Sequence, residues 1–260
     1  MYYCAEENVL RAEGAVRFFG RATARQEHMK QRPTSHPIDL RSIKAITFDL
    51  DGTLYPEYRM LFPTLAVAFR HPRILYAFSR VRREVRRSRV EEDFRSHQAS
   101  LMARRLGTST DRAAELTEKI IYGRWLNALS GMRPFRGLRG LILRLRRKGL
   151  KTALLSDMPI TKKVVYLGLE DVWDCAYTSE ETGALKPDPR AFERMISALG
   201  CDPRQIMYIG NNYEYDVVGA GSMGMVTGLI SSRRIRNNRA DFVFRNYRRM
   251  KEFLVSLIEI

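Results

Sequence analysis

Two aspartates, one residue apart, end an apolar run in "ITFDLDGTLYP". In an open parallel sheet, ligands bind outside the carboxyl ends of the strands, and Asp49 stands at such an end. Gly52 permits a turn there, and the Thr53 hydroxyl can hold that turn by hydrogen bonding. Asp49 and Asp51 repel each other unless a cation or a shared proton intervenes. The pattern therefore suits either Mg²⁺ binding or a division of labour between a base and an acid, with a solvated surface turn as the plain alternative.

Polar side chains also end three later apolar runs. "LLSDMP" places Ser156 at the end of one run, where its hydroxyl suits a phosphate oxygen. "GALKPDPRAF" places Lys186 at a strand-to-helix junction, and in "IMYIGNNYEYD" the apolar run ends with Gly210 and Asn211, with Asp216 five residues after Asn211. Each residue taken singly is more often structural. Taken in order at four strand ends, they favour a functional role over a merely structural one.

The elements that must position these residues form an α/β pattern. Short, nearly continuous apolar runs such as "AITFDL", "KTALLSD", "CAYTSEE", "IMYIGNN", "VTGLIS" and "DFVF" alternate with helix-length segments. Such runs are typical of parallel strands buried on both faces. The sequence therefore predicts a doubly wound parallel sheet with helices on both sides, closed at the C-terminus by a helical stripe that includes Tyr247, Phe253 and Leu257.

Two segments break this pattern. Residues 57–132 offer no strand and repeat helical spacing, which predicts a helical insertion after the first strand. Residues 1–40 show weak periodicity and two prolines near their end, which indicates a poorly ordered N-terminal extension with Met29 as an alternative start. The expected organisation is a core of residues 41–56 and 133–260 with a cap of residues 57–132.

The motifs together resemble those of a known superfamily. Asp49-Leu50-Asp51-Gly52-Thr53, then Ser156, then Lys186-Pro187, then Gly210-Asn211 with Asp216, is similar to the four motifs of haloacid dehalogenase-like hydrolases. The resemblance covers about residues 44 to 245. It implies a Rossmann-like core with a helical cap over the active site.

The resemblance also implies a mechanism. Asp49 would attack phosphorus to give an aspartyl phosphate, and Asp51 would protonate the leaving alkoxide and then activate water. Ser156 and Lys186 would complete the catalytic set by holding the phosphoryl group. The implied phosphate-binding residues are Gly52, Thr53, Ser156, Asp157 and Lys186, and the implied Mg²⁺ ligands are Asp49, Asp51 through its backbone carbonyl, Asn211 and Asp216.

Two positions qualify this assignment. Asp51 with Thr53 is similar to the phosphatase members, whereas dehalogenase members have a different residue at position 51. The fourth motif usually begins Gly-Asp, but this chain has Gly210-Asn211, and an amide brings no negative charge to a metal ion. The sequence leaves open a working phosphatase with weaker metal binding and a relative that binds phosphate or a protein without turnover.

The chain is strongly basic. It has 45 Lys and Arg against 29 Asp and Glu, a formal net charge of +16, which favours contact with anions. Six arginines lie between residues 80 and 89 on a predicted helix, and a solvated face is the expected role for them. Weak association of this helix with a membrane surface is an alternative. Nucleic acid is not expected, because no aromatic residues are interleaved for base stacking.

The remaining features predict a soluble cytoplasmic enzyme. The three cysteines form neither a disulfide framework nor a metal-ligand spacing, which favours a reducing compartment. No apolar run approaches the roughly 20 residues that span a bilayer. The expected activity is a Mg²⁺-dependent phosphatase acting on a small phosphorylated metabolite, and the sequence predicts no oligomeric state.

Overall fold

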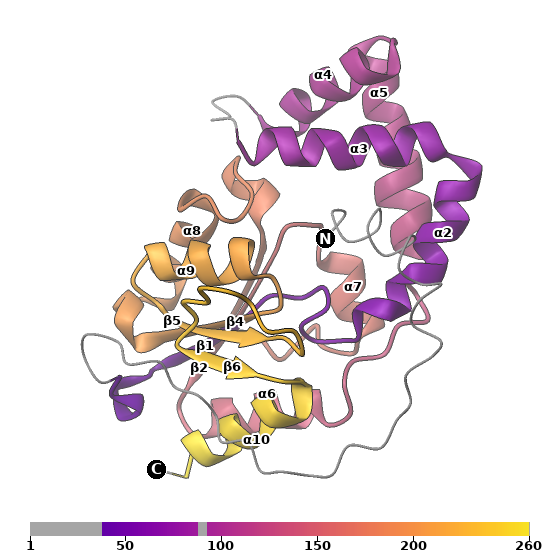
Figure 1. Ribbon diagram of the computed structural model, residues 1–260. Helices are drawn as coiled ribbons and strands as arrows, with labels where there is room; N and C mark the ends of the chain where they lie inside the picture. Colours follow the sequence, from indigo (N-terminus) through magenta and orange to yellow (C-terminus); the bar gives the residue numbers. More distant parts are fainter. Residues whose placement is uncertain (1–37, 88–92, 260) are drawn as a thin grey trace.

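The structure is a computed structural model that describes residues 38–87 and 93–259. Its centre is a six-stranded, wholly parallel sheet in the order β3-β2-β1-β4-β5-β6 (Figure 1). The predictions for Met29, Arg89 and most of the N-terminal extension lie outside the described residues. The strands are β1 (Ala45–Phe48), β2 (Lys151–Ser156), β3 (Cys175–Thr178), β4 (Ile206–Gly210), β5 (Val226–Ile230) and β6 (Phe242–Phe244).

Helices cover both faces of this sheet, which confirms the predicted doubly wound α/β fold (Figure 1). α8 (Arg190–Leu199) and α9 (Gly219–Ser222) lie on one face, and α6 (Leu138–Arg147) and α10 (Tyr247–Leu257) lie on the other. The predicted C-terminal stripe is confirmed, since its apolar residues are the buried ones of α10. The remaining core elements are η2 (Leu40–Ser42), α7 (Thr161–Tyr166), η5 (Ser179–Thr182), η6 (Pro203–Gln205) and the π-helix η7 (Tyr213–Val218).

The alternation of side chains along each strand divides the interior into two clusters. In β1, Ala45 belongs to the cluster that contains Phe192 and Met195 of α8, whereas Ile46 and Phe48 belong to the larger cluster that contains α6 and α10. Successive residues of a strand point to opposite faces of a sheet. Fully apolar strands therefore follow from burial on both sides.

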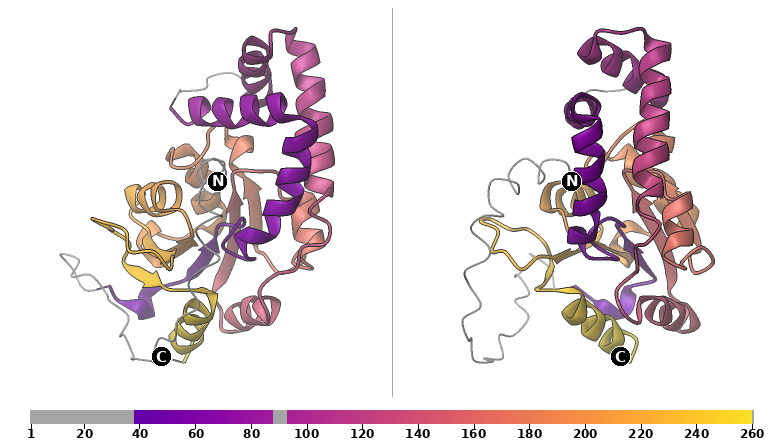
Figure 2. Two further views of the ribbon diagram at one scale, coloured as in Figure 1. Left: turned by 45° about the vertical axis from the view of Figure 1, so that its right-hand side comes forward. Right: turned by 90° about the vertical axis from the view of Figure 1, so that its right-hand side faces the viewer.

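An insertion of helices separates β1 from α6. It consists of η3 (Glu57–Met60), α2 (Leu61–Arg70), α3 (Pro72–Val85), α4 (Phe94–Leu106), α5 (Thr110–Leu116) and the π-helix η4 (Thr117–Trp125). Figures 1 and 2 show these helices as a body beside the sheet, with α3 crossing above α8 and α9 in the view of Figure 1. Within the described part of 57–132, no strand interrupts the helices.

Candidate active site

The parallel register brings the predicted strand-end residues to one edge of the sheet. Phe48 of β1 is paired with Leu154 of β2 and with Ile209 of β4. Asp49, directly after β1, and Ser156, the last residue of β2, therefore lie at the same end of the strands. The catalytic candidates are all buried, with exposed fractions of 6% for Asp49, 3% for Asp51, 0% for Ser156, 2% for Lys186 and 1% for Asp216.

The turn after β1 depends on a glycine. Gly52 has φ +84°, and a Cβ at this position would lie 2.2 Å from the Asn211 side-chain nitrogen. Glycine is therefore needed for its backbone conformation and for the space that Asn211 takes. Thr53 Oγ1 donates to Asp49 Oδ2 at 2.8 Å and lies 3.4 Å from Asn211 Oδ1. Thr53 thus links the first motif to the fourth.

Lys186 joins the two carboxylates on the β4 side. Its ammonium lies 2.8 Å from Asp49 Oδ1 and 2.6 Å from Asp216 Oδ1, and it donates to Tyr208 Oη at 3.1 Å. Burial acts to lower the pKa of Lys186, but Asp216 and Asp49 outweigh it and raise that pKa well above its usual value. Lys186 is therefore a fixed cation in the site.

The same surroundings raise the pKa of the Asp49 carboxyl. Burial raises the pKa of Asp49 to about 7, a rise that Lys186 opposes and that Asp216 and Asp51 reinforce. A cation beside Asp49 would reverse this rise, because an opposite charge favours the ionised form. The site therefore favours binding of positive charge at Asp49.

Asp216 is placed by the loop after β4. Its Oδ2 accepts from the backbone N–H of Asn212 at 2.9 Å, and it lies on the π-helix η7. A Cβ on Gly210 would lie 2.2 Å from an Asp216 oxygen, so the glycine of the fourth motif makes room for this carboxylate. π-helical turns occur frequently at functional sites.

Asp51 has partners that the sequence reasoning missed. The Lys163 ammonium lies 2.7 Å and 2.6 Å from the two oxygens of Asp51, and the Tyr55 hydroxyl donates to Oδ1. Lys163 is fully buried on α7. It stands at i+3 from Ile160 and one residue before Val164, on an apolar stripe that also includes Leu167. A lysine within a buried stripe was the signal that would have identified it.

Ser156 ends β2 and Asp157 follows it, but their side chains have different partners. Ser156 Oγ lies 3.4 Å from Asp51 Oδ2, inside the site. The Asp157 carboxylate accepts from Ser179 Oγ at 2.7 Å and from the Lys186 backbone N–H at 3.1 Å. Burial acts to raise the pKa of Asp157, but Arg86, Lys186 and other cations hold it well below its usual value. Because that carboxylate repels phosphate, phosphate binding by Asp157 would have to use its backbone.

The arginine-rich helix α3 is not the wholly solvated face that we expected. Arg82 is 2% exposed, pairs with Glu180 at 2.5 Å and donates to the Asp157 carbonyl. Arg86 pairs with Asp157 at 2.6 Å and donates to the Lys186 carbonyl at 3.1 Å. The expectation failed because buried acceptors in the core loops lie beneath this helix. Two of the six arginines thus join the insertion to the loops that carry Ser156 and Lys186.

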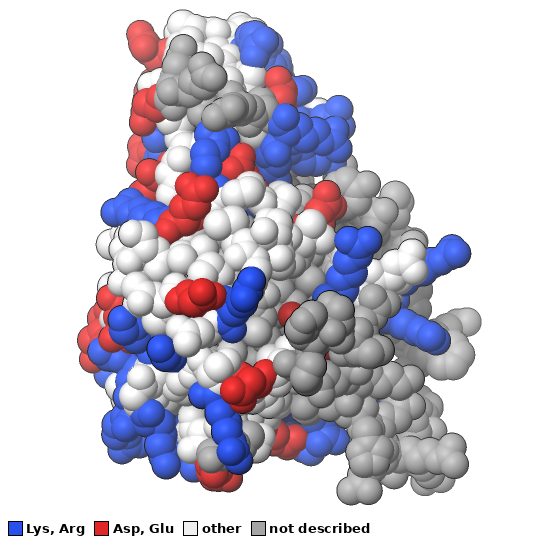
Figure 3. Space-filling view, turned by 90° about the vertical axis from the view of Figure 1, so that its left-hand side faces the viewer, with Lys and Arg blue, Asp and Glu red and all other residues white. Residues whose placement is uncertain are grey.

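The basic charge is dispersed on the face seen in Figure 3. Lys and Arg side chains there lie over the insertion and the lower part of the core, with Asp, Glu and uncharged residues between them (Figure 3). Nucleic-acid binding needs a basic patch or stripe along the backbone path. Among the described residues visible on this face, Lys and Arg do not form a continuous stripe (Figure 3).

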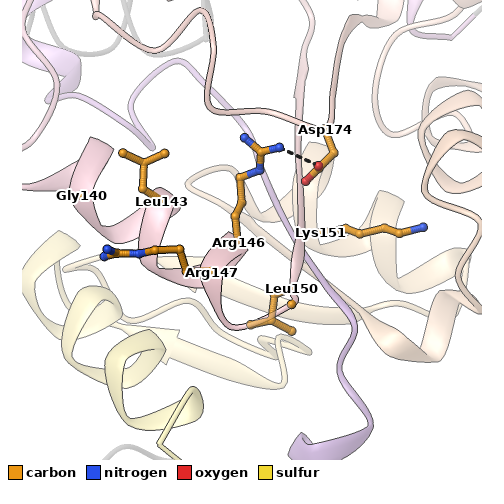
Figure 4. Close-up of a pocket in the computed structure, with 8 residues that line it drawn as sticks. Gly140, Leu143, Arg146, Arg147, Leu150, Lys151 and Asp174 are labelled. Carbon is orange, nitrogen blue, oxygen red and sulfur yellow. Dashed lines mark hydrogen bonds and ion pairs between the residues drawn. The ribbon is translucent and has the colours of Figure 1, made fainter.

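Two hollows lie at opposite ends of the strands. One, of about 780 Å³, is lined by Gly52 and Asn211 at the catalytic turn and by Arg233, Arg245 and Arg248. The other, of about 560 Å³, contains the Arg146–Asp174 ion pair and Lys151, the first residue of β2 (Figure 4). Ligands of open α/β sheets bind at the carboxyl ends of the strands, so only the first hollow adjoins the expected position.

Comparison with known proteins agrees with this geometry. The family model of the haloacid dehalogenase-like hydrolases matches residues 43–224, which include all four strand-end motifs. This chain belongs to that family. In the described residues of this family member, no helix is long and apolar enough to cross a membrane.

Relatives within the family differ in the activity that their names state. The chain is 31% identical over 118 residues to the glyceraldehyde 3-phosphate phosphatase of Methanothermobacter thermautotrophicus, a match covering 44% of this chain and 52% of that protein. It is 28% identical over 200 residues to the (S)-2-haloacid dehalogenase of Pseudomonas sp. strain YL, covering 71% of this chain and 81% of that protein. The chain thus spans about half the length of the first relative.

A solved structure supports the fold. The L-2-haloacid dehalogenase of Xanthobacter autotrophicus, with chloropropionic acid covalently bound, superimposes with a TM-score of 0.60 at 19% identity. The match covers 82% of this chain and 98% of that structure. At this identity the likeness establishes the fold alone, so the substrate has to be inferred from the residues of the site.

The donors that family resemblance assigns to Mg²⁺ are oxygens. Within residues 38–87 and 93–259, no group of three or more His, Cys, Asp or Glu side chains is arranged to hold a metal ion. The Asp49 carboxylate and the Asn211 amide, however, both lie against the Thr53 hydroxyl. Mg²⁺ commonly binds one or two carboxylates and keeps several waters. The Asp49 carboxylate and the Asn211 amide thus supply oxygen donors of the kind this ion takes, while Lys186 contacts Asp49 and Asp216 alike.

Proposed function

We propose that this hydrolase is a Mg²⁺-dependent phosphatase that acts on a small phosphomonoester through an aspartyl-phosphate intermediate. The observation that carries the proposal is the second carboxylate. Asp51 lies in the same buried site as Asp49, with Ser156 3.4 Å from it. A carboxylate at this position supplies the acid and base that hydrolysis of a phosphate ester needs.

The residues divide the work. Thr53 and Lys186 hold one oxygen each of the Asp49 carboxylate, which fixes the attacking group, and a cation beside Asp49 would keep it in the ionised form that attacks. Lys186 and Ser156 would bind the phosphoryl oxygens as charge shifts in the transfer. Mg²⁺, held by Asp49, Asn211 and the Asp51 carbonyl, would supply charge neutralisation at the phosphoryl group.

Lys163 sets a condition on the acid step. Both oxygens of Asp51 contact the Lys163 ammonium, at 2.7 Å and 2.6 Å, so this carboxylate has no free oxygen for a leaving group or a water. Protonation of the leaving alkoxide requires this ion pair to loosen when substrate enters.

The helical insertion serves as the cap. Arg82 and Arg86 connect α3 to the loops of Ser156 and Lys186 by hydrogen bonds. A movement of the insertion would therefore displace both loops. Caps of this kind exclude water from the reaction and open for product release. We propose that substrate choice depends on residues 57–132.

Hydrolysis of p-nitrophenyl phosphate with and without Mg²⁺ tests the proposal. We expect Mg²⁺-dependent turnover by the wild type and none by Asp49→Asn, with Asp111→Asn on the exposed part of α5 as the matched control. Release of chloride from 2-chloropropionate with no phosphate release would instead assign a dehalogenase. Absence of both activities would favour the non-catalytic phosphate- or protein-binding alternative that Asn211 raises.

A further inference from the structure

Helix α2 presents an apolar face to solvent. Leu61, Phe62, Leu65 and Phe69 are 41%, 79%, 43% and 89% exposed, at spacings that place them on one side of the helix. Val67, by contrast, is buried. A surface helix ordinarily has polar residues on its outer side. The outer side of α2 is therefore suited to contact with another apolar phase.

The exposed apolar side chains are concentrated there. Among the described residues, the large hydrophobic side chains that are exposed number eight, and six of them lie between residues 58 and 76. We call this set the α2 patch: Tyr58, Leu61, Phe62, Leu65, Phe69 and Tyr76. Exposed hydrophobic residues that are scattered singly are ordinary, whereas their concentration in one segment is typical of an interaction site.

The helix itself is anchored to the insertion. Thr64 Oγ1 accepts a hydrogen bond from the Trp125 indole at 3.0 Å, and α2 runs alongside η4 in both views of Figure 2. Its inner side is therefore already paired with η4. Phe62 and Phe69 are therefore exposed although α2 is packed against the rest of the insertion.

The charge of the segment indicates the nature of the partner. Residues 58–76 contain three arginines, Arg59, Arg70 and Arg73, all of them exposed, and no Asp or Glu. A second copy of this chain would bring another net charge of +16 toward the first. Like charges of this size oppose self-association, whereas an anionic surface is attracted. The charge therefore favours an anionic partner over a copy.

We propose that the α2 patch binds the surface of a membrane that contains anionic lipid. Phe62, Leu65 and Phe69 would enter the boundary between headgroups and acyl chains, as the apolar face of an interfacial helix does. Tyr58 and Tyr76 are amphipathic side chains of the kind enriched at that boundary. The arginines would contact anionic headgroups. This inference does not depend on the proposed phosphatase activity.

Co-sedimentation of the full chain with vesicles tests the inference. We expect binding to vesicles of phosphatidylcholine mixed with phosphatidylglycerol, and weaker binding to phosphatidylcholine alone. The double variant Phe62→Ser/Phe69→Ser should lower the partition coefficient by roughly tenfold or more, since each buried aromatic side chain adds to membrane affinity. The matched control Val165→Ser/Val218→Ser removes two exposed apolar side chains elsewhere and should bind as the wild type does.

Two double arginine variants distinguish an effect of the α2 patch from an effect of the net charge. Arg70→Gln/Arg73→Gln and Arg234→Gln/Arg236→Gln lose the same two charges, but only the first pair borders the patch. We expect only the first pair to weaken binding strongly. Thermal unfolding of each variant shows that it folds. Equal binding by wild type and Phe62→Ser/Phe69→Ser, or equal loss for the two arginine pairs, would overturn the proposal.

Sedimentation velocity distinguishes a second copy. A wild-type dimer that becomes monomeric in Phe62→Ser/Phe69→Ser, with no vesicle binding at low ionic strength, would assign the patch to self-association and refute the membrane surface. A monomeric wild type that binds the mixed vesicles supports it.

Discussion

The two halves of the site use a buried lysine in different ways. On the β4 side, Lys186 contacts Asp49 and Asp216, so that one positive charge faces two carboxylates. On the β2 side, Lys163 contacts both oxygens of Asp51, so that one positive charge faces one carboxylate. The β4 side therefore retains a deficit of positive charge and the β2 side is balanced. In the proposed mechanism a divalent cation beside Asp49 would offset this deficit, and Asp51 would serve in proton transfer.

Replacement of Lys186 by Met should have the largest effect. It leaves Asp49 and Asp216 buried without their cation and removes a donor to the phosphoryl group. We expect kcat to fall by about 10²–10³-fold, the range seen when a donor that stabilises the transition state is removed. Steady-state hydrolysis of p-nitrophenyl phosphate at saturating Mg²⁺ measures the loss. Lys151→Met at the exposed start of β2 is the control, and wild-type kcat in Lys186→Met would refute the role of this lysine.

Replacement of Lys163 by Met should leave the Asp51 carboxylate without its buried cation. Removing one partner of a buried ion pair typically costs about 3–5 kcal/mol of stability, because the other charge stays buried. We expect a lower unfolding temperature and a fall in kcat of about 10–10²-fold, within the usual contribution of general acid–base catalysis. The neighbour Lys162, which contacts Asn127 at 2.9 Å, provides the matched control Lys162→Met. If Lys162→Met and Lys163→Met had the same kcat, the contact of Lys163 with Asp51 would have no catalytic role.

The contrast between the two lysines also shows what a sequence can predict. Strand ends were predictable because apolar runs identify the strands, and a parallel register brings their last residues together. Lys186 follows that logic only in part, because it lies in the turn between η5 and α8 and not at the end of β3. Lys163 does not, because it comes from the interior of a helix, and its contact with Asp51 joins positions 112 residues apart. The helical nature of the insertion was predictable from its spacing, but the contacts of Arg82 and Arg86 depend on how the insertion packs against the core.

Asn211→Asp should sharpen the charge deficit of the β4 side. The variant adds a second negative charge beside Asp49, next to Gly52 and Thr53. We expect the Mg²⁺ concentration for half-maximal activity to fall by roughly tenfold, since the charge of the ligands sets affinity for hard cations. Isothermal titration calorimetry with Mg²⁺ alone gives a readout that is independent of turnover. Asn212→Asp, one residue further along, is the control, and an unchanged Mg²⁺ affinity in Asn211→Asp would show that position 211 is not a ligand.

The smallest expected effect is a pH dependence of stability that belongs to the β4 side alone. Because burial raises the pKa of Asp49 to about 7, its contribution to stability is full at low pH and is lost as the pH rises through about 7. Asp49→Asn carries no such charge, while Lys186 keeps Asp216 as a partner. With metal removed by a chelator, the unfolding temperature of Asp49→Asn minus that of the wild type should therefore increase from pH 5 to pH 8. Asp111→Asn, on the surface, should show no such trend. A constant difference for Asp49→Asn would mean that Asp49 stays ionised throughout, and that Lys186 alone compensates for the crowded carboxylates.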